Sequence, residues 1–187
     1  MIFVFDSTPL IYLSKVGLSW IFRELSGEVL IPKSVFGEVV AEGERRGDAD
    51  AFIVRELVKD KIISVVDAGN EFKRKFEGLS AELHQGEIDV LALASARGGI
   101  AIFDETIVRD IGTILGIETH GTFYLIFLMF PRRMSGRVVT RRVSTVKKGK
   151  LSRKEAKNKV DEMVKKGWRI GHERYLEFME LLERIEE

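Results

Sequence analysis

Short β-type runs alternate with helical patterns along residues 1–130, and this alternation constrains the fold more than any other feature of the sequence. The runs are IFVF (2–5), EVLI (28–31), IISVV (62–66), IAIF (100–103) and IETH (117–120). β-Branched and aromatic residues dominate most of them, and only short connections separate them from the helical stretches. Repeated units of this kind predict an α/β fold with three layers, α/β/α, in which helices cover both faces of a central parallel sheet.

Residues that favour helix ends bound the helical stretches. Gly17 and Gly116 follow two of them, Pro32 precedes a third, and Pro131 ends the last helix of this part of the chain. We expect helices over 9–16, 18–25, 33–46, 49–59, 70–77, a stretch ending at 97, 105–115 and 122–130. Two further helices, over 152–166 and 172–185, finish the chain, and the second repeats apolar residues at helical spacing: Tyr175, Phe178, Leu182 and Ile185.

Charge and composition divide the chain into three segments. Residues 1–130 carry 13 Lys and Arg against 20 Asp and Glu, whereas residues 131–159 carry 12 basic residues and a single acid. We predict a core at 1–130, a basic loop or hairpin at 131–150, and a C-terminal helical extension at 151–187 that packs on the core. An acidic body with a basic arm suggests an anionic partner that approaches an anionic site.

Composition excludes several classes of protein. The chain has no cysteine, so disulfides, thiolate nucleophiles and cysteine-ligated zinc are excluded, and a reducing compartment is expected. The longest apolar run, FYLIFLMF at 123–130, is far shorter than the roughly 18 residues that span a bilayer. An acid at position 6 interrupts the first apolar stretch, so no secretory signal is expected. We therefore expect a soluble, cytoplasmic protein without membrane contact.

Two aspartates follow predicted strands directly. Asp6 ends the run at 2–5, and Asp104 ends the run at 100–103. In a parallel sheet the carboxyl ends of the strands lie at one edge, and ligands bind there near the point where the strand order reverses. Both aspartates are therefore expected at that edge.

Two glutamates in helical stretches are expected to reach the same edge. Glu38 lies three residues after Val35 and borders an apolar stripe, and Glu87 is in line with Leu91 in GEIDVLALA, so its side chain should point inward. Asp89 lies about 200° around the helix from Glu87, at roughly 100° per residue, and is expected to be solvated.

Each acid also has an ordinary structural explanation. Asp6 and Asp104 could cap the helices that follow them, Glu87 could interact with a helix dipole, and Glu38 could be a surface residue. Four carboxylates at one edge would nevertheless repel each other unless a cation lay among them. Such a cluster suits Mg²⁺ or Mn²⁺, one or two ions, in two-metal phosphoryl transfer. The three histidines show no pairing at metal-ligand spacing.

Several stretches resemble the PIN-domain family of metal-dependent ribonucleases, in its archaeal and bacterial branch related to VapC-type toxins. They are FDSTPLIYLSK, LIPKSVFGEVV, HQGEIDVLALASARGG, IFDETIVRDIGTILGIETHGT and, more weakly, DEMVKKGWRIGHERYLEFM. The resemblance implies a PIN-like fold and RNA cleavage that depends on Mg²⁺ or Mn²⁺. It implies a catalytic and metal-binding quartet made of Asp6, Glu38, Glu87 and Asp104. It also implies that Glu105 is an accessory metal-binding acid and that Ser7 touches a phosphate or orders Asp6.

Two hypotheses from different classes follow. In the first, the chain is an endoribonuclease for single-stranded or structured RNA, and basic residues hold the RNA backbone: Arg132, Arg133, Arg137, Arg141 and Arg142, with Lys147 and Lys148. In the second, it is a catalytically silent PIN-like module that binds RNA or protein. A toxin role with a small antitoxin partner follows from the resemblance alone. The apolar faces of the last helices and of 123–130 suit either a homodimer or packing within the chain.

Overall fold

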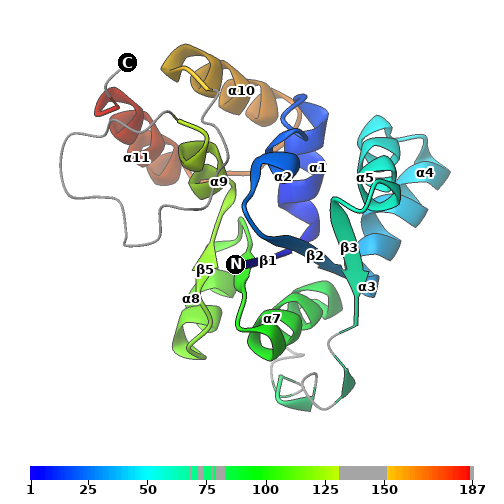
Figure 1. Ribbon diagram of the computed structural model, residues 1–187. Coiled ribbons are helices and arrows are strands. Elements are labelled where there is room, and N and C mark those ends of the chain that lie inside the picture. The colour runs from blue at the N-terminus through cyan, green and yellow to red at the C-terminus, as the bar shows by residue number, and fades with distance from the viewer. Residues whose placement is uncertain (68, 71–73, 77, 79–82, 131–150, 186–187) are drawn as a thin grey trace.

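Five parallel strands form one sheet at the centre of the protein (Figure 1). The structure is a computed structural model, and it describes residues 1–67, 69–70, 74–76, 78, 83–130 and 151–185. The strands are β1 (Ile2–Phe5), β2 (Glu28–Pro32), β3 (Ile63–Val66), β4 (Ile100–Ile102) and β5 (Thr119–His120), in the order β3-β2-β1-β4-β5. All four pairings are parallel, as the alternating pattern predicts. The chain moves outward from β1 to β3 and then returns to β4 on the other side of β1. The strand order therefore reverses between β1 and β4.

Helices cover both faces of the sheet. Their bounds are α1 (Ser7–Lys15), α2 (Ile21–Glu24), α3 (Lys33–Phe36), the π-helical turn η1 (Gly37–Glu42), α4 (Gly43–Arg46), α5 (Ala49–Lys59), α7 (Gln85–Arg97), α8 (Thr106–Ile114), α9 (Thr122–Leu128), α10 (Arg153–Lys165) and α11 (His172–Glu183). α1 packs against α5, whereas α7 packs on β1, β2 and β4. Right-handed crossovers place α1 and α5 on one face and α7 and α8 on the other. The three-layer prediction is confirmed.

The predicted boundaries agree with the structure to within a few residues, with two informative differences. The stretch expected as one helix over 33–46 contains the π-helical turn η1, which inserts an extra residue per turn and changes the direction of the side chains that follow. The last strand is shorter than expected, because the backbone N–H of Ile117 donates to Gly112 in the turn that ends α8. Half of the helix expected at 70–77 falls outside the described residues.

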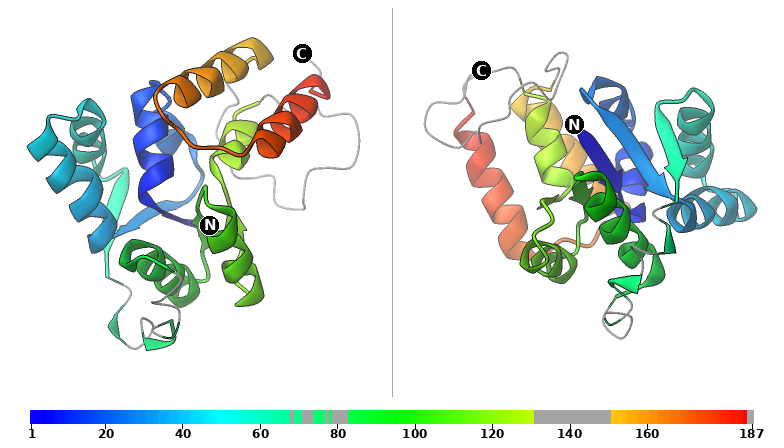
Figure 2. Two further views of the ribbon diagram at one scale, coloured as in Figure 1. Left: turned by 180° about the vertical axis from the view of Figure 1, so that it is seen from behind. Right: turned by 60° about the horizontal axis from the view of Figure 1, so that its bottom comes forward.

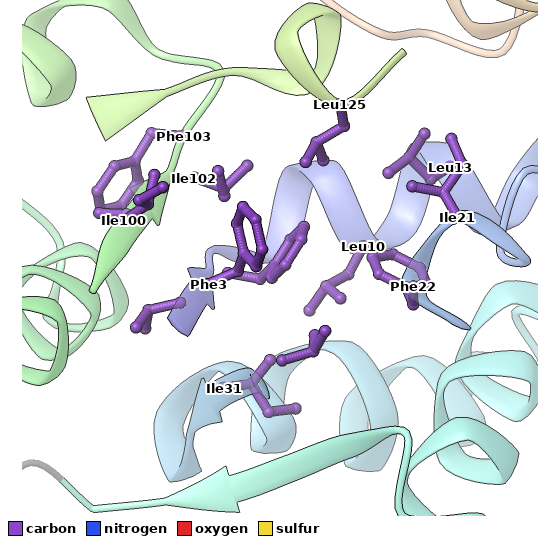
Figure 3. Close-up of a cluster of buried hydrophobic side chains, with 14 of the residues drawn as sticks. Phe3, Leu10, Leu13, Ile21, Phe22, Ile31, Ile100, Ile102, Phe103 and Leu125 are labelled. Carbon is purple, nitrogen blue, oxygen red and sulfur yellow. The ribbon is translucent and has the colours of Figure 1, made fainter. Parts of the chain in front are cut away.

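The core lies where apolar faces of the sheet and helices meet (Figure 3). Phe3, Leu10 and Ile102 are completely buried there, and the ring of Phe5 contacts that of Phe22 edge-on at 5.3 Å. Full burial of one such side chain stabilises the fold by about 1.5–3 kcal/mol. These buried apolar side chains therefore support the edge of the sheet that carries Asp6.

The two C-terminal helices pack on the core beside α1 and α9 (Figures 1 and 2). α10 buries Ala156, Val160 and Met163, and the ring of Phe178 from α11 stacks on Phe123 of α9 at 4.3 Å. The apolar stripe predicted for the last helix therefore packs largely within the chain. No helix among the described residues is long and apolar enough to cross a membrane.

Candidate active site

The carboxyl ends of β1 and β4 lie side by side at the point where the strand order reverses. Phe5 pairs with Ile102, and the backbone N–H of Asp6 donates to the carbonyl of Ile102 at 3.1 Å. Asp6 is also the N-cap residue of α1, in an extended conformation that makes no side-chain capping hydrogen bond. Its carboxylate is thus placed at the edge of the sheet, next to the first backbone N–H groups of α1.

Burial and neighbouring carboxylates govern the charge of Asp6. Desolvation is the largest cause that raises its pKa, and the charges of Glu87 and Glu38 raise it further, to about 7. The backbone N–H groups of Ser7 and Thr8 oppose this shift in part. The carboxyl group therefore sits among like charges, in surroundings that favour a proton or a metal cation over a free carboxylate.

Glu38 reaches this group from the π-helical turn η1. Its Oε2 accepts a hydrogen bond of 2.7 Å from the hydroxyl of Ser7, the residue that follows Asp6. A Cβ added to Gly86 would lie 3.9 Å from the same oxygen, so the start of α7 also lies close to Glu38. In this structure Ser7 orders Glu38, whereas the family resemblance implied a contact of Ser7 with a phosphate or with Asp6.

Glu87 enters from the first turn of α7 and is 7% exposed, as its place in the apolar stripe predicts. Its Oε2 accepts a 2.7 Å hydrogen bond from the backbone N–H of His84. Glu87 therefore also stabilises the start of its helix, in line with the structural explanation considered for it in the sequence. Burial raises its pKa most, and the charges of Glu105 and Glu38 raise it further, against the His84 contacts that lower it. Glu87 is thus electrostatically coupled to both of these acids and to Asp6.

Asp104 lies at the expected edge of the sheet, just after β4, and its side chain is hydrogen-bonded to partners that the sequence did not predict. Its Oδ1 accepts from the backbone N–H of Thr122 at 2.8 Å, and its Oδ2 accepts from the Thr122 hydroxyl at 2.8 Å and from the indole Nε1–H of Trp168 at 2.9 Å. Burial raises the pKa of Asp104, while these three hydrogen bonds and the charge of Arg109 lower it. The carboxylate therefore binds the start of α9 and the C-terminal extension. No pattern in the sequence predicts the contact with Trp168.

Asp6, Glu38 and Glu87 act on one another electrostatically, and the charge of Glu105 acts on Glu87; we call these four residues the acid cluster. The carboxylate oxygens of Asp104 are instead hydrogen-bonded to Thr122 and Trp168. Glu105 is exposed at the N-cap position of α8, immediately after Asp104. The extra methylene of glutamate lets Glu105 reach further than an aspartate would.

Asp89 is buried, and the expectation that it would be solvated is wrong. It is 4% exposed and accepts hydrogen bonds from Ser34 at 2.7 Å and from Gln85 at 2.9 Å. α3 packs against this side of α7 and covers the face that the helical wheel assigned to solvent. The arginines predicted to hold RNA, from Arg132 to Arg142, lie outside the described residues.

The donor set of the acid cluster fits a hard divalent cation. Carboxylate oxygens are the ligands that Mg²⁺ and Mn²⁺ prefer, and among the described residues no Lys or Arg lies within ion-pair distance of any of the four acids. In the described part of the chain no three Asp, Glu, His or Cys side chains converge closely enough to hold one ion. Binding of an ion would therefore have to draw the carboxylates closer together.

Comparison with known proteins identifies the family. A family model described as DUF3368, a PIN domain, matches residues 2–140. The chain belongs to the PIN-domain family. The resemblance noted in the sequence is therefore confirmed. A search of curated proteins found no match.

Solved structures that match this chain include two of low sequence identity. One is VapBC-1 from nontypeable Haemophilus influenzae, with 13% identity and a TM-score of 0.47, where the match covers 65% of this chain and 98% of that chain. The other is a domain of a functionally unknown protein from Methanocaldococcus jannaschii DSM 2661, with 17% identity and a TM-score of 0.44, covering 75% of this chain and 98% of that one.

Proposed function

We propose that this PIN domain is an endoribonuclease that depends on Mg²⁺ or Mn²⁺ and hydrolyses single-stranded or structured RNA. The observation that carries the proposal is the acid cluster at the strand-order reversal, where the pKa of Asp6 is raised to about 7 by burial and by two neighbouring carboxylates. An uncompensated group of acids is costly to a fold, and metal binding is the function that explains it best.

Each residue of the cluster has a role in the proposed mechanism. Asp6, Glu38, Glu87 and Glu105 would bind one or two ions, and this assignment replaces Asp104 of the expected quartet with Glu105. Ser7 holds Glu38 in place through its 2.7 Å hydrogen bond. A bound Mg²⁺ or Mn²⁺ supplies a water of lowered pKa and stabilises charge on the phosphate oxygens. No histidine is needed as a general base, which agrees with the capping position of His84.

The proposal is tested by titrating the purified protein with Mn²⁺ while following its thermal unfolding and the cleavage of a labelled single-stranded RNA. Mn²⁺ should raise the melting temperature by mass action and start cleavage in the wild type. Glu38→Gln should lose both effects. Glu42→Gln is the matched control, because Glu42 lies on the same π-helical turn and is exposed to solvent.

The outcomes separate the two hypotheses for this chain. RNA binding without any cleavage, in a protein that does not respond to Mn²⁺, would favour the catalytically silent module. Cleavage that survives in both Glu38→Gln and Asp6→Asn would come from a contaminating nuclease and would remove the support for the enzyme.

A toxin role, a small antitoxin partner and a homodimer are further proposals. They rest on the resemblance of the sequence to the VapC-type branch of the PIN-domain family. Expression of the chain alone should slow bacterial growth, and Asp6→Asn should restore it. Normal growth with the wild-type protein well expressed would contradict the toxin role.

A further inference from the structure

A cleft of about 890 Å³ opens beside the acid cluster. One wall is formed by α8, β5 and α9, and the other by the turn before α11 and by α11 itself. Its lining includes Glu105 of the acid cluster, the neighbouring Asp104, and Thr8, which lies two residues after Asp6. This volume lies within the range of roughly 300–1,000 Å³ that is typical of ligand sites, so a nucleotide fits it by size.

Two arginines, one from each wall, line this cleft. Arg109 comes from α8 and is half-buried, and Arg174 comes from α11 and is exposed. Burial is the first cause that lowers the pKa of Arg109, and the charge of Arg174 is the second, so the two guanidinium groups are close enough to repel.

The floor of the cleft fixes the position of Arg109. Its Nη2 donates to the hydroxyl of Thr106 at 3.2 Å, and a Cβ added to Gly121 would lie 2.8 Å from its Nη1. The absence of a side chain at Gly121 therefore lets Nη1 of Arg109 come close to the start of α9. A larger residue at that position would push it away.

Carboxylates inside the cleft neutralise this pair in part. Glu177 accepts from Arg174 at 3.3 Å, and the charges of Asp104, Asp110 and Glu177 oppose the lowered pKa of Arg109. Asp104 already accepts three hydrogen bonds from other groups. Within the described part of the chain, Arg109 forms no ion pair at 4 Å or less. Its guanidinium group thus has donors left for an anion that enters from solvent.

An aromatic pair lines the same cleft. The rings of His120 and Tyr124 stack at 3.8 Å with an angle of 8° between their planes, and both side chains are half-buried. Flat aromatic rings are a usual surface on which single-stranded bases stack. A nucleotide therefore finds here both an anion-binding group and a stacking group.

We propose that this cleft binds the single-stranded RNA substrate next to the acid cluster, with a backbone phosphate between Arg109 and Arg174 and a base on the Tyr124–His120 pair. The inference rests on the proposed function, because it assigns a binding site to the RNA strand that the acid cluster is proposed to cleave. It differs from the predicted role of the basic segment 131–150, since every residue that it uses belongs to the described part of the chain.

Binding is measured by fluorescence anisotropy of a labelled single-stranded RNA of about twelve nucleotides, in EDTA so that no cleavage occurs. Arg109→Gln and Arg174→Gln should each weaken binding by about tenfold at low salt and reduce the slope of log affinity against log salt by about one. Arg97→Gln is the matched control, because Arg97 is exposed at the end of α7 and lies outside the cleft. Tyr124→Leu should weaken binding, whereas Tyr124→Phe should not.

Three results would overturn the inference. The first is a double variant of Arg109 and Arg174 that binds RNA as tightly as the wild type does. The second is a loss of RNA affinity in Arg97→Gln as large as in the cleft variants, and the third is a wild-type protein that binds duplex RNA more tightly than single strands. Arg174 lies on the surface of α11, so its variant tests the cleft even where Arg109→Gln fails to fold. Asp6→Asn should stop cleavage in Mn²⁺ and keep RNA binding in EDTA. This variant therefore distinguishes an error in the proposed RNA-binding cleft from an error in the proposed nuclease function.

Discussion

Trp168 and Asp104 are joined across 64 positions of the sequence by a 2.9 Å hydrogen bond from the indole Nε1–H to Oδ2. Thr122 donates to the same carboxylate from its backbone and from its hydroxyl. The three groups connect the turn after β4, the start of α9 and the turn before α11. Since Glu105 belongs to the first of these turns, the C-terminal extension supports the geometry of the acid cluster.

Trp168→Phe should weaken Mn²⁺ binding without removing any residue of the acid cluster. The new ring keeps the edge-on packing against Phe123, at 5.2 Å in the wild type, and loses the N–H that holds Asp104. We expect a loss of about 1–2 kcal/mol in the free energy of unfolding, because a buried acceptor loses one partner. Urea unfolding and calorimetric Mn²⁺ titration measure the two effects. Trp20→Phe is the control, and unchanged Mn²⁺ affinity in Trp168→Phe would make Trp168 purely structural.

Asp104→Asn and Glu105→Gln should have opposite consequences. The amide in Asp104→Asn replaces one acceptor oxygen with a donor, which leaves Thr122 or Trp168 unsatisfied and lowers the free energy of unfolding by about 1–3 kcal/mol. Glu105 is exposed, so Glu105→Gln should leave stability nearly unchanged and weaken Mn²⁺ binding and cleavage. Thermal unfolding with and without Mn²⁺ compares them. Full Mn²⁺ affinity in Glu105→Gln, with loss in Asp104→Asn, would return Asp104 to the metal site.

Asp6→Asn should stabilise the metal-free protein at pH 8. The folded-state pKa of Asp6 is about 7, above its ordinary value of 3.8, so folding favours its protonated form. Its contribution to stability is fully present below about pH 4 and is lost as the pH rises through about 7. We expect a gain on the order of 2 kcal/mol at pH 8 that vanishes near pH 4, measured by urea unfolding in EDTA. A destabilised variant at pH 8 would show that Asp6 is not under charge repulsion.

Mn²⁺ affinity of the wild type should fall with decreasing pH below about 7. A proton and the metal ion compete for the Asp6 carboxyl group, so the observed affinity should drop about tenfold for each pH unit below its pKa. Calorimetric titrations at several pH values measure this slope. The same affinity at pH 6 and pH 8 would mean that Asp6 takes no part in binding.

Ser34→Ala should destabilise the fold and leave metal binding intact. It removes the 2.7 Å hydrogen bond to Asp89, a buried acid that ties α3 to α7. We expect a loss of about 1–2 kcal/mol in the free energy of unfolding. Mn²⁺ titration is the control measurement, and loss of Mn²⁺ affinity with unchanged stability would place Asp89 in the metal site.

Local sequence patterns are enough to predict the layers of this protein and the edge of the sheet that carries its acids. The period of two in the strands and the helical period between them fix which faces are apolar, and a helix between successive strands returns the chain to the same end of the sheet, so the strands pair in parallel. Asp6 and Glu87 followed from these local rules. The first lies directly after a strand, and the second lies in the apolar stripe of its helix.

The choice of which neighbouring acid joins the cluster depends on tertiary contacts. Asp104 and Glu105 are adjacent in the sequence and have similar chemistry, and local pattern provides no reason to separate them. Trp168 and Thr122 supply donors for Asp104 from elements that fold against it from far along the chain, and α3 likewise covers Asp89. A helical wheel or strand pattern describes one element at a time. The partner of a side chain depends on which elements pack against it, and packing brings together residues that are distant in the sequence.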